Sequence, residues 1–137
     1  MSSAASAITL PVHRLFDEVW NQRKLDVLDA ILMPDFVLNP GPQEIRGPAG
    51  VRQMISAFLA AFPDVMHQMD DLFAAGDKVT VRWHGQGTHR GEFAGIAATG
   101  KQMEYWGITI CQIAGGRIAK GWVVADMLGL VQQLGGK

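Results

Sequence analysis

Asp126 is the residue whose type and setting best suit it to acid–base chemistry. It follows the strand-like run Ile118–Ala125 and precedes the wholly apolar run Met127–Val131. Residues two apart in a strand share a face, so Asp126 points the same way as Trp122. A carboxylate among apolar neighbours loses hydration and holds a proton more tightly, which makes it a useful base near neutral pH. The same position also lets Asp126 cap the following helix, and the spacing leaves both roles open.

Arg82 and His84 are the candidate partners of this base. They alternate with Trp83, so period two places them together on one strand face. If that face lines a cleft, both side chains can donate hydrogen bonds to a developing oxyanion. The alternative is a surface ladder in which they pair with acidic side chains, for which the candidates are Asp70, Asp71 and Glu104.

The sequence gives little support for a metal site, a nucleotide-binding site or a nucleophilic side chain. The four histidines lack metal-ligand spacing, and the glycines form neither a Walker loop nor a dinucleotide fingerprint. We therefore expect no metal and no nucleotide cofactor. Cys111 lies in a strand between Ile110 and Gln112 and is interpreted as a packing residue. His67 stands alone and is interpreted as structural or solvated, and His89 as a stabiliser of a tight bend.

Composition narrows the class of protein. The chain has 137 residues, of which 48% are hydrophobic and 18% charged, with a net charge of −1 and one cysteine. This describes one globular domain, predicted over residues 8–137 after a disordered tail at 1–7. No basic stripe favours nucleic acid, and no apolar run reaches the roughly 18–20 residues that span a bilayer. We expect a cytoplasmic protein.

The first half of the chain reads as three helices and a short strand. A stripe at Val12, Leu15, Phe16 and Val19 indicates an amphipathic helix that Thr9 can cap, with Pro11 in its first turn. A second helix covers 25–32 and ends at Pro34, before a strand at 36–39. A third helix begins near 47–48 and ends before Pro63.

The second half reads as an antiparallel meander. Period-two runs predict strands at 65–74, 78–85, 101–113 and 118–125, followed by a small helix at 127–134. Helices followed by strands indicate an α+β domain with the helices packed on one face of the sheet. Strands with few charges leave apolar sheet surface uncovered, so we expect a homodimer through the outer sheet face.

Aromatic residues predict an internal apolar pocket. Trp106, Trp122, Phe16 and Trp20 are expected to line a cavity for a planar or polycyclic ligand. Asn39, Arg82 and His84 would orient the ligand's polar groups.

Short motifs along nearly the whole chain, from about residue 10 to 135, resemble the SnoaL-like polyketide cyclases. This family is one branch of the nuclear transport factor 2-like superfamily, which also contains ketosteroid isomerase and limonene epoxide hydrolase. The matching segments are Trp20-Asn21, Leu25-Asp26, 34–37, 62–64, 76–79, 87–93, 99–101 and 116–130.

The resemblance implies a cone-shaped roll, in which a curved antiparallel sheet wraps around three helices and encloses a deep apolar pocket. It also implies a dimer through the outer sheet face and catalysis without metal or organic cofactor. In the cyclases, the aspartate that matches Asp126 is the general acid/base of an intramolecular aldol closure. Two departures separate this chain from the relatives. Asn39-Pro40 stands where ketosteroid isomerase has its basic aspartate, and His84 stands where the epoxide hydrolases have a second aspartate.

Three classes of function remain open from the sequence. The first is a cofactor-independent cyclase or related lyase, isomerase or epoxide hydrolase that uses Asp126. The second is a small-molecule-binding module with the same pocket and no turnover. The third is an interaction protein that uses the sheet to dimerise, which the retention of Asp126, Arg82 and His84 disfavours.

Overall fold

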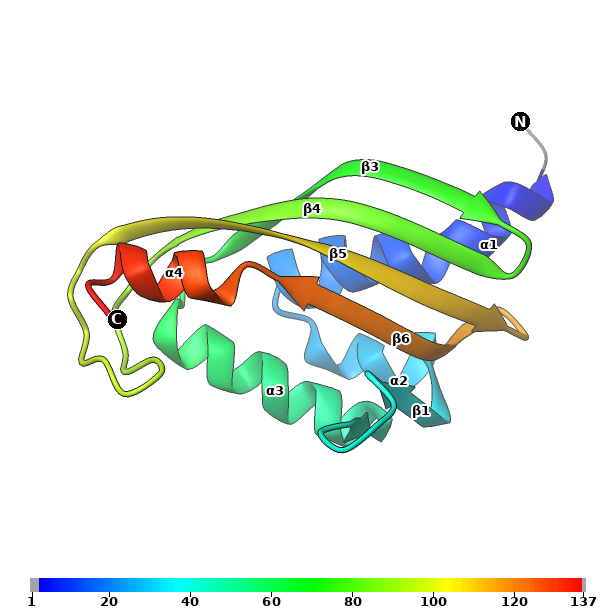
Figure 1. Ribbon diagram of the computed structural model, residues 1–137. Helices are drawn as coiled ribbons and strands as arrows, with labels where there is room; N and C mark the ends of the chain where they lie inside the picture. The colour runs from blue at the N-terminus through cyan, green and yellow to red at the C-terminus, as the bar shows by residue number, and fades with distance from the viewer. Residues whose placement is uncertain (1–2, 137) are drawn as a thin grey trace.

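The computed structural model describes residues 3–136, with side chains described from Ala7 onward. Its helical elements are α1 (Ser3–Arg14), the π-helical η1 (Leu15–Asn21), the 3₁₀ turn η2 (Leu25–Val27), α2 (Leu28–Ile31), α3 (Gly47–Ala61) and α4 (Met127–Gln133). Its strands are β1 (Leu32–Leu38), β2 (Ile45–Arg46), β3 (Met66–Ala75), β4 (Lys78–Thr88), β5 (Gln102–Ala114) and β6 (Arg117–Ala125). This mixed architecture confirms the predicted α+β class (Figure 1).

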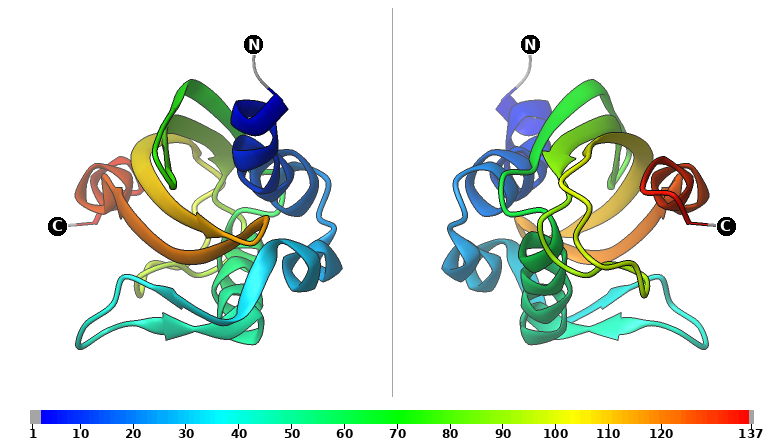
Figure 2. Two further views of the ribbon diagram at one scale, coloured as in Figure 1. Left: turned by 90° about the vertical axis from the view of Figure 1, so that its right-hand side faces the viewer. Right: turned by 90° about the vertical axis from the view of Figure 1, so that its left-hand side faces the viewer.

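The strands form one six-stranded sheet in the order β2-β1-β6-β5-β4-β3. All neighbouring pairs are antiparallel except β1 and β6, which run parallel. Figure 2 shows that the sheet curves without closing and that α1, η1, α2 and α3 fill its concave side. Helix α4 lies apart from them, at the end of the sheet beside β5.

Irregular pairing occurs at three places in this sheet. Asp70 is the extra residue of β3, because Met69 pairs with Trp83 and Asp71 with Arg82. The register also shifts between β5 and β6 at Gln112 and Ile113, and between β1 and β6. A bulge bends its strand and increases the local twist, so these positions contribute to the curvature of the sheet.

Burial follows the strand period closely on the central strands. In β5 the odd-numbered residues from Met103 to Ile113 are buried, and the even-numbered ones are exposed or half-buried. The buried set faces the helices and joins the core, whose fully buried members include Val12, Val19, Leu28, Ile55 and Phe62. The other face of the sheet is the outer face of the molecule.

Several element boundaries differ from the predicted ones. The first helix begins at Ser3, so Pro11 lies inside it, four residues before the π-helical segment. The predicted tail at 1–7 falls partly outside the described residues, since residues 1–2 are not described. Pro34 lies within β1, in the stretch between Leu32 and Val37 where the pairing with β6 is interrupted, so its missing N–H is tolerated. Gly85 and Gly87 do not end β4, which continues to Thr88.

No helix in residues 3–136 is long and apolar enough to cross a membrane.

Candidate functional site

An internal cavity of about 90 Å³ lies between the concave face of the sheet and the helices. Apolar side chains make up most of its wall, and they come from η1, α3, β1, β5 and β6. They are Leu15, Phe16, Trp20, Leu32, Phe36, Leu38, Val51, Met54, Ile55, Cys111, Ile118 and Val123. The polar members of the wall are His67, Trp83, Tyr105 and Thr109, together with the backbone at Gly121.

The sequence-based placement of Phe16 and Trp20 in this cavity agrees with the structure. Both residues come from η1, the π-helical segment. Inserted π-helical turns are frequent at functional sites because they re-aim the side chains of one helix face. Trp20 lies with its ring centroid 4.4 Å from that of His67.

Trp106 and Trp122 do not line the cavity, which corrects their predicted place. Trp106 pairs with His84, and Trp122 pairs with Ile110, on the outer face of the sheet. Trp106 is 52% exposed. Their neighbours Tyr105 and Val123 face the cavity instead, because strand side chains alternate between faces.

Asn39, which was predicted to orient the ligand, does not line the cavity either. Its backbone has φ of +51°, a conformation that asparagine tolerates at the end of a strand. Its Oδ1 accepts a hydrogen bond of 2.9 Å from the backbone N–H of Val123. Asn39 therefore ties the end of β1 to β6 and is not part of the cavity wall.

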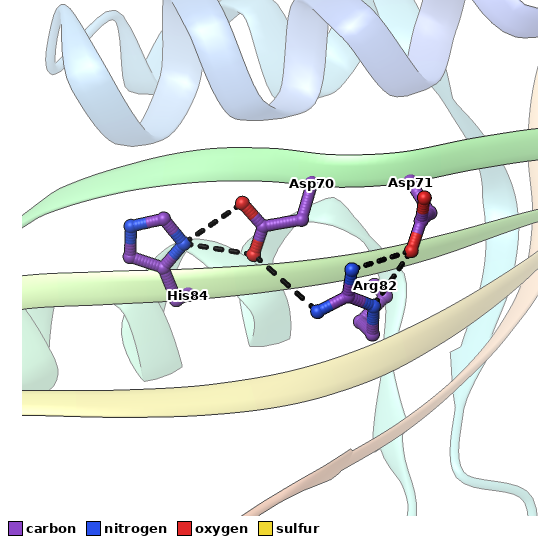
Figure 3. A network of polar contacts seen from close by, with 4 residues as sticks. All are labelled: Asp70, Asp71, Arg82 and His84. Carbon is purple, nitrogen blue, oxygen red and sulfur yellow. Dashed lines mark hydrogen bonds and ion pairs between the residues drawn. The ribbon is translucent and has the colours of Figure 1, made fainter.

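Arg82 and His84 lie on the outer face and pair with acidic side chains, in the surface ladder that the sequence left open as an alternative. His84 Nδ1 lies 2.8 Å from Asp70 Oδ2, and Arg82 Nη2 lies 2.6 Å from Asp71 Oδ2. Figure 3 shows the four side chains together over β3 and β4. The bulge at Asp70 explains why two consecutive aspartates reach one face, which strict alternation forbids.

Asp126 lies at the start of α4 and is exposed. Its Oδ1 accepts a hydrogen bond of 2.9 Å from the backbone N–H of Gly129, the contact of a helix N-cap. The backbone N–H of Asp126 donates to the carbonyl of Trp106. Trp106 in turn pairs with His84, so Trp106 lies between Asp126 and His84. The structure thus gives Asp126 the capping contact and does not bring it to the cavity wall.

The polar groups that do face the cavity are a histidine and a tyrosine from different strands. His67 Nε2 lies 2.5 Å from Tyr105 Oη, and the two residues are 5% and 6% exposed. A second polar contact lies nearby, in which Trp83 Nε1–H donates to Thr109 Oγ1 at 2.9 Å.

Burial keeps the ionisable groups of the cavity neutral. It lowers the pKa of His67 to about 3, with smaller electrostatic contributions from the nearby Arg23 and His84 side chains. Burial likewise raises the pKa of the Tyr105 phenol above its usual value and raises that of the Cys111 thiol to about 12. A neutral buried thiol is a poor nucleophile, which agrees with the packing role predicted for Cys111.

His67 and Tyr105 were missed as site residues although the strand pattern contained the signal. His67 alternates with Val65 and Met69 in a strand that the sequence predicts, so its side chain shares their apolar face. Tyr105 alternates in the same way with Met103 and Thr109. What the sequence lacks is any sign that the two residues meet.

Within the described part of the chain, no three His, Cys, Asp or Glu side chains lie close enough together to hold a metal ion.

Comparison with known proteins agrees with this architecture. TsrD from Streptomyces laurentii has 29% identity, a TM-score of 0.87, and coverage of 100% of this chain and 99% of its own. IdmH from Streptomyces antibioticus has 26% identity and a TM-score of 0.83, with 93% and 98% covered. A candidate polyketide cyclase from Acidithiobacillus ferrooxidans has 31% identity and a TM-score of 0.78, with 98% and 97% covered.

No curated protein matches the sequence significantly. The family model for SnoaL-like polyketide cyclases matches residues 11–134, which span every element from the end of α1 to α4. Together with the fold, this match shows that the chain belongs to the SnoaL-like polyketide cyclase family.

Proposed function

We propose that the internal cavity binds a small apolar carbonyl compound and that the chain promotes its ring closure by an intramolecular aldol reaction. The observation that carries this proposal is an apolar cavity with a small neutral polar cluster, His67 with Tyr105 and Trp83 with Thr109. Apolar walls hold the carbon skeleton folded, and a few polar groups orient its oxygens. Membership of a cyclase family supports the same reaction class.

The size of the cavity limits the ligand that enters without rearrangement. Its volume of about 90 Å³ is smaller than the roughly 150 Å³ of a cavity that admits benzene. A single ring or a folded short chain therefore displaces lining side chains, and a polycyclic ligand requires a larger opening. Leu15, Trp20 and Met54 are half-buried lining residues on the helical side and are the candidates to move.

A binding module without turnover is the second candidate. It is favoured by one observation, the position of Asp126, whose carboxylate caps α4 away from the cavity wall. The acid–base role predicted for Asp126 from the sequence is tested below by paired variants.

We also propose that the chain forms a homodimer through the outer face of the sheet. Apolar side chains from neighbouring strands cluster there, with Trp106, Ile108 and Val124 at 52%, 40% and 76% exposure. A contiguous exposed apolar patch of this kind is typical of a protein–protein contact.

The test of the catalytic proposal uses 2,4,6-heptanetrione, a linear triketone. Its aldol closure joins a terminal methyl carbon to the far carbonyl carbon, and loss of one water then gives a methylresorcinol. We expect the protein to accelerate this closure above the spontaneous rate, as followed by proton NMR. Met54→Trp, which fills the cavity, should abolish the acceleration, whereas Leu10→Trp on the exposed surface of α1 should preserve it.

The two candidate functions predict different failures. Binding of the triketone without acceleration of its ring closure would favour the binding module over the cyclase. Acceleration that survives Met54→Trp would contradict the cavity as the site.

A further inference from the structure

The contact between His67 and Tyr105 depends on the residue between them. His67 pairs with Gly85 across β3 and β4, and Gly85 pairs with Tyr105 across β4 and β5. The three residues therefore form one row across three strands. A Cβ on Gly85 would lie 2.6 Å from Tyr105 Cε1 and 2.9 Å from His67 Cδ2. The missing side chain is what lets the flanking side chains meet above the middle strand.

Other residues fix the histidine in this row. The side-chain amide of Asn21 accepts from the backbone N–H of His67 and donates to its carbonyl, both at 2.8 Å. Rings of Trp20 and Trp83 lie 4.4 and 5.2 Å from the imidazole, centroid to centroid. The imidazole is thus held in place from its backbone and from both neighbouring elements before any ligand enters.

The His67–Tyr105 pair has one more polar hydrogen than the hydrogen bond between its two rings uses. Neutral imidazole carries one N–H and neutral phenol one O–H, while one hydrogen bond joins the two rings. If Nε2 carries the hydrogen and donates it to Oη, the tyrosine O–H is left for another acceptor. If Nε2 instead accepts from the tyrosine, Nδ1 carries the hydrogen, and Nδ1 has no partner among the described residues. In either tautomer one polar hydrogen is unpaired.

We propose that Tyr105, with His67 donating to its hydroxyl oxygen, gives a hydrogen bond to a carbonyl or enolate oxygen of the ligand in the cavity. A ligand oxygen there selects the first tautomer, because only that one frees the hydroxyl hydrogen on the cavity-lining phenol. The donated bond from His67 polarises the phenol and strengthens its own donation. The pair thereby selects ligands that carry an acceptor oxygen, and it stabilises negative charge that develops on that oxygen. This inference rests on the proposed ligand-binding role of the cavity.

The test compares two small ligands of one shape. Cyclopentanone carries the acceptor oxygen, and methylenecyclopentane has a CH₂ group in its place. We expect the wild type to bind the ketone more tightly, and Tyr105→Phe to lose about 3- to 10-fold in ketone affinity with the alkene affinity unchanged. Ile118→Val, a change in the apolar part of the same wall, should affect both ligands equally.

A spectroscopic readout keeps the test independent of variant stability. The infrared C=O stretch of bound cyclopentanone should move to lower frequency in the wild type than in an apolar solvent. Gly85→Ala, which separates the two rings, should reduce that shift, and a melt checks that the variant folds.

Each result has one reading. Equal binding of both ligands, or a bound carbonyl stretch like that in an apolar solvent, would overturn the inference and leave the cavity as a ligand site. If neither ligand binds the wild type at millimolar concentration, the inference and the proposed function both fail. Equal losses for both ligands in Tyr105→Phe would show a packing role for the hydroxyl.

Discussion

The proton on His67 links the cavity to the stability of the fold. Burial lowers its pKa to about 3 in the folded chain, against about 6.5 for an exposed histidine. Between these values the unfolded state binds a proton that the folded state does not. The free energy of unfolding therefore falls as the pH falls from about 6.5 toward about 3.

This coupling gives a pH prediction. Urea unfolding should show about 2 kcal/mol less stability at pH 5 than at pH 7 from this residue. His67→Gln should remove most of the difference, whereas His13→Gln, at an exposed position on α1, should keep it. Asp64, whose pKa the Thr88 hydroxyl lowers, adds to the loss in the same direction but in a more acidic range. An unchanged difference in His67→Gln would contradict the burial argument.

Asp126 gives a prediction that separates its two roles. As an N-cap, Asp126→Asn should retain the stability of the wild type, and Asp126→Ala should lose about 1 kcal/mol. Both are measured in a thermal melt together with closure of the triketone. A loss of turnover of roughly 10²-fold or more in Asp126→Asn, at full stability, would support the general base predicted from the sequence.

Single residues also show where sequence reasoning succeeds and where it ends. Period two correctly groups Arg82 with His84, since alternation is a property of any strand. It does not say which of the two faces is the inner one. For that reason Trp106 and Trp122, predicted to line the cavity, lie on the outer face, and the sequence leaves Arg82 and His84 open between a cleft and a surface ladder. The neighbours of His67, by contrast, are apolar on the face that became the interior.

Side-chain amides complete the hydrogen bonding of two strands at their unpaired edges. Asn21 pairs with both backbone groups of His67 on the outermost strand β3. Gln133 does the same for Glu104 of β5, at 3.0 and 2.7 Å, beyond the point where β6 has ended. Each amide takes the place of a neighbouring strand, so the edge keeps its geometry without another strand.

The first of these pairs predicts a measurable loss. Asn21→Leu leaves the N–H and carbonyl of His67 without their partners and should cost about 1–3 kcal/mol in the free energy of unfolding. Amide hydrogen exchange at His67 should become faster in the same variant. Gln22→Leu, at the neighbouring exposed position, should leave both quantities unchanged. Equal effects of the two substitutions would indicate a general effect on the helix.

Elements were predicted more reliably than their connections. The third helix and the four long strands lie close to their expected ranges, because their apolar periods are long and clear. Strand β1 begins earlier than expected because a proline such as Pro34 is expected to end the preceding helix, and β2 has two residues and no period. No local pattern marks the parallel pairing of β1 with β6, which joins segments far apart in the chain.

At the scale of the whole molecule, the two faces of one sheet have different uses. The concave face encloses the cavity, and the outer face carries the exposed cluster Trp106, Ile108 and Val124 beside the charged ladder of Figure 3. An apolar centre with a charged margin is the usual composition of a subunit contact.

The dimer proposal has a direct test. We expect light scattering at micromolar concentration to give twice the mass of the chain, and Ile108→Glu with Val124→Glu to give the monomer mass. Leu10→Glu, at an exposed apolar position on α1, should remain dimeric. A monomer in the wild type would remove the outer face as a self-association surface.

The extra residue in β3 has a consequence for how such a cavity can change size. Asp70 interrupts the pairing, but the residues before and after it keep their own partners on β4. Deleting it would therefore leave His67 opposite Gly85 and Asp71 opposite Arg82, while removing a source of bending. The depth of the cone then depends on backbone length at a position outside the cavity wall. Insertions and deletions of single outward-facing residues can thus retune the volume available to a substrate while every residue that touches it stays the same.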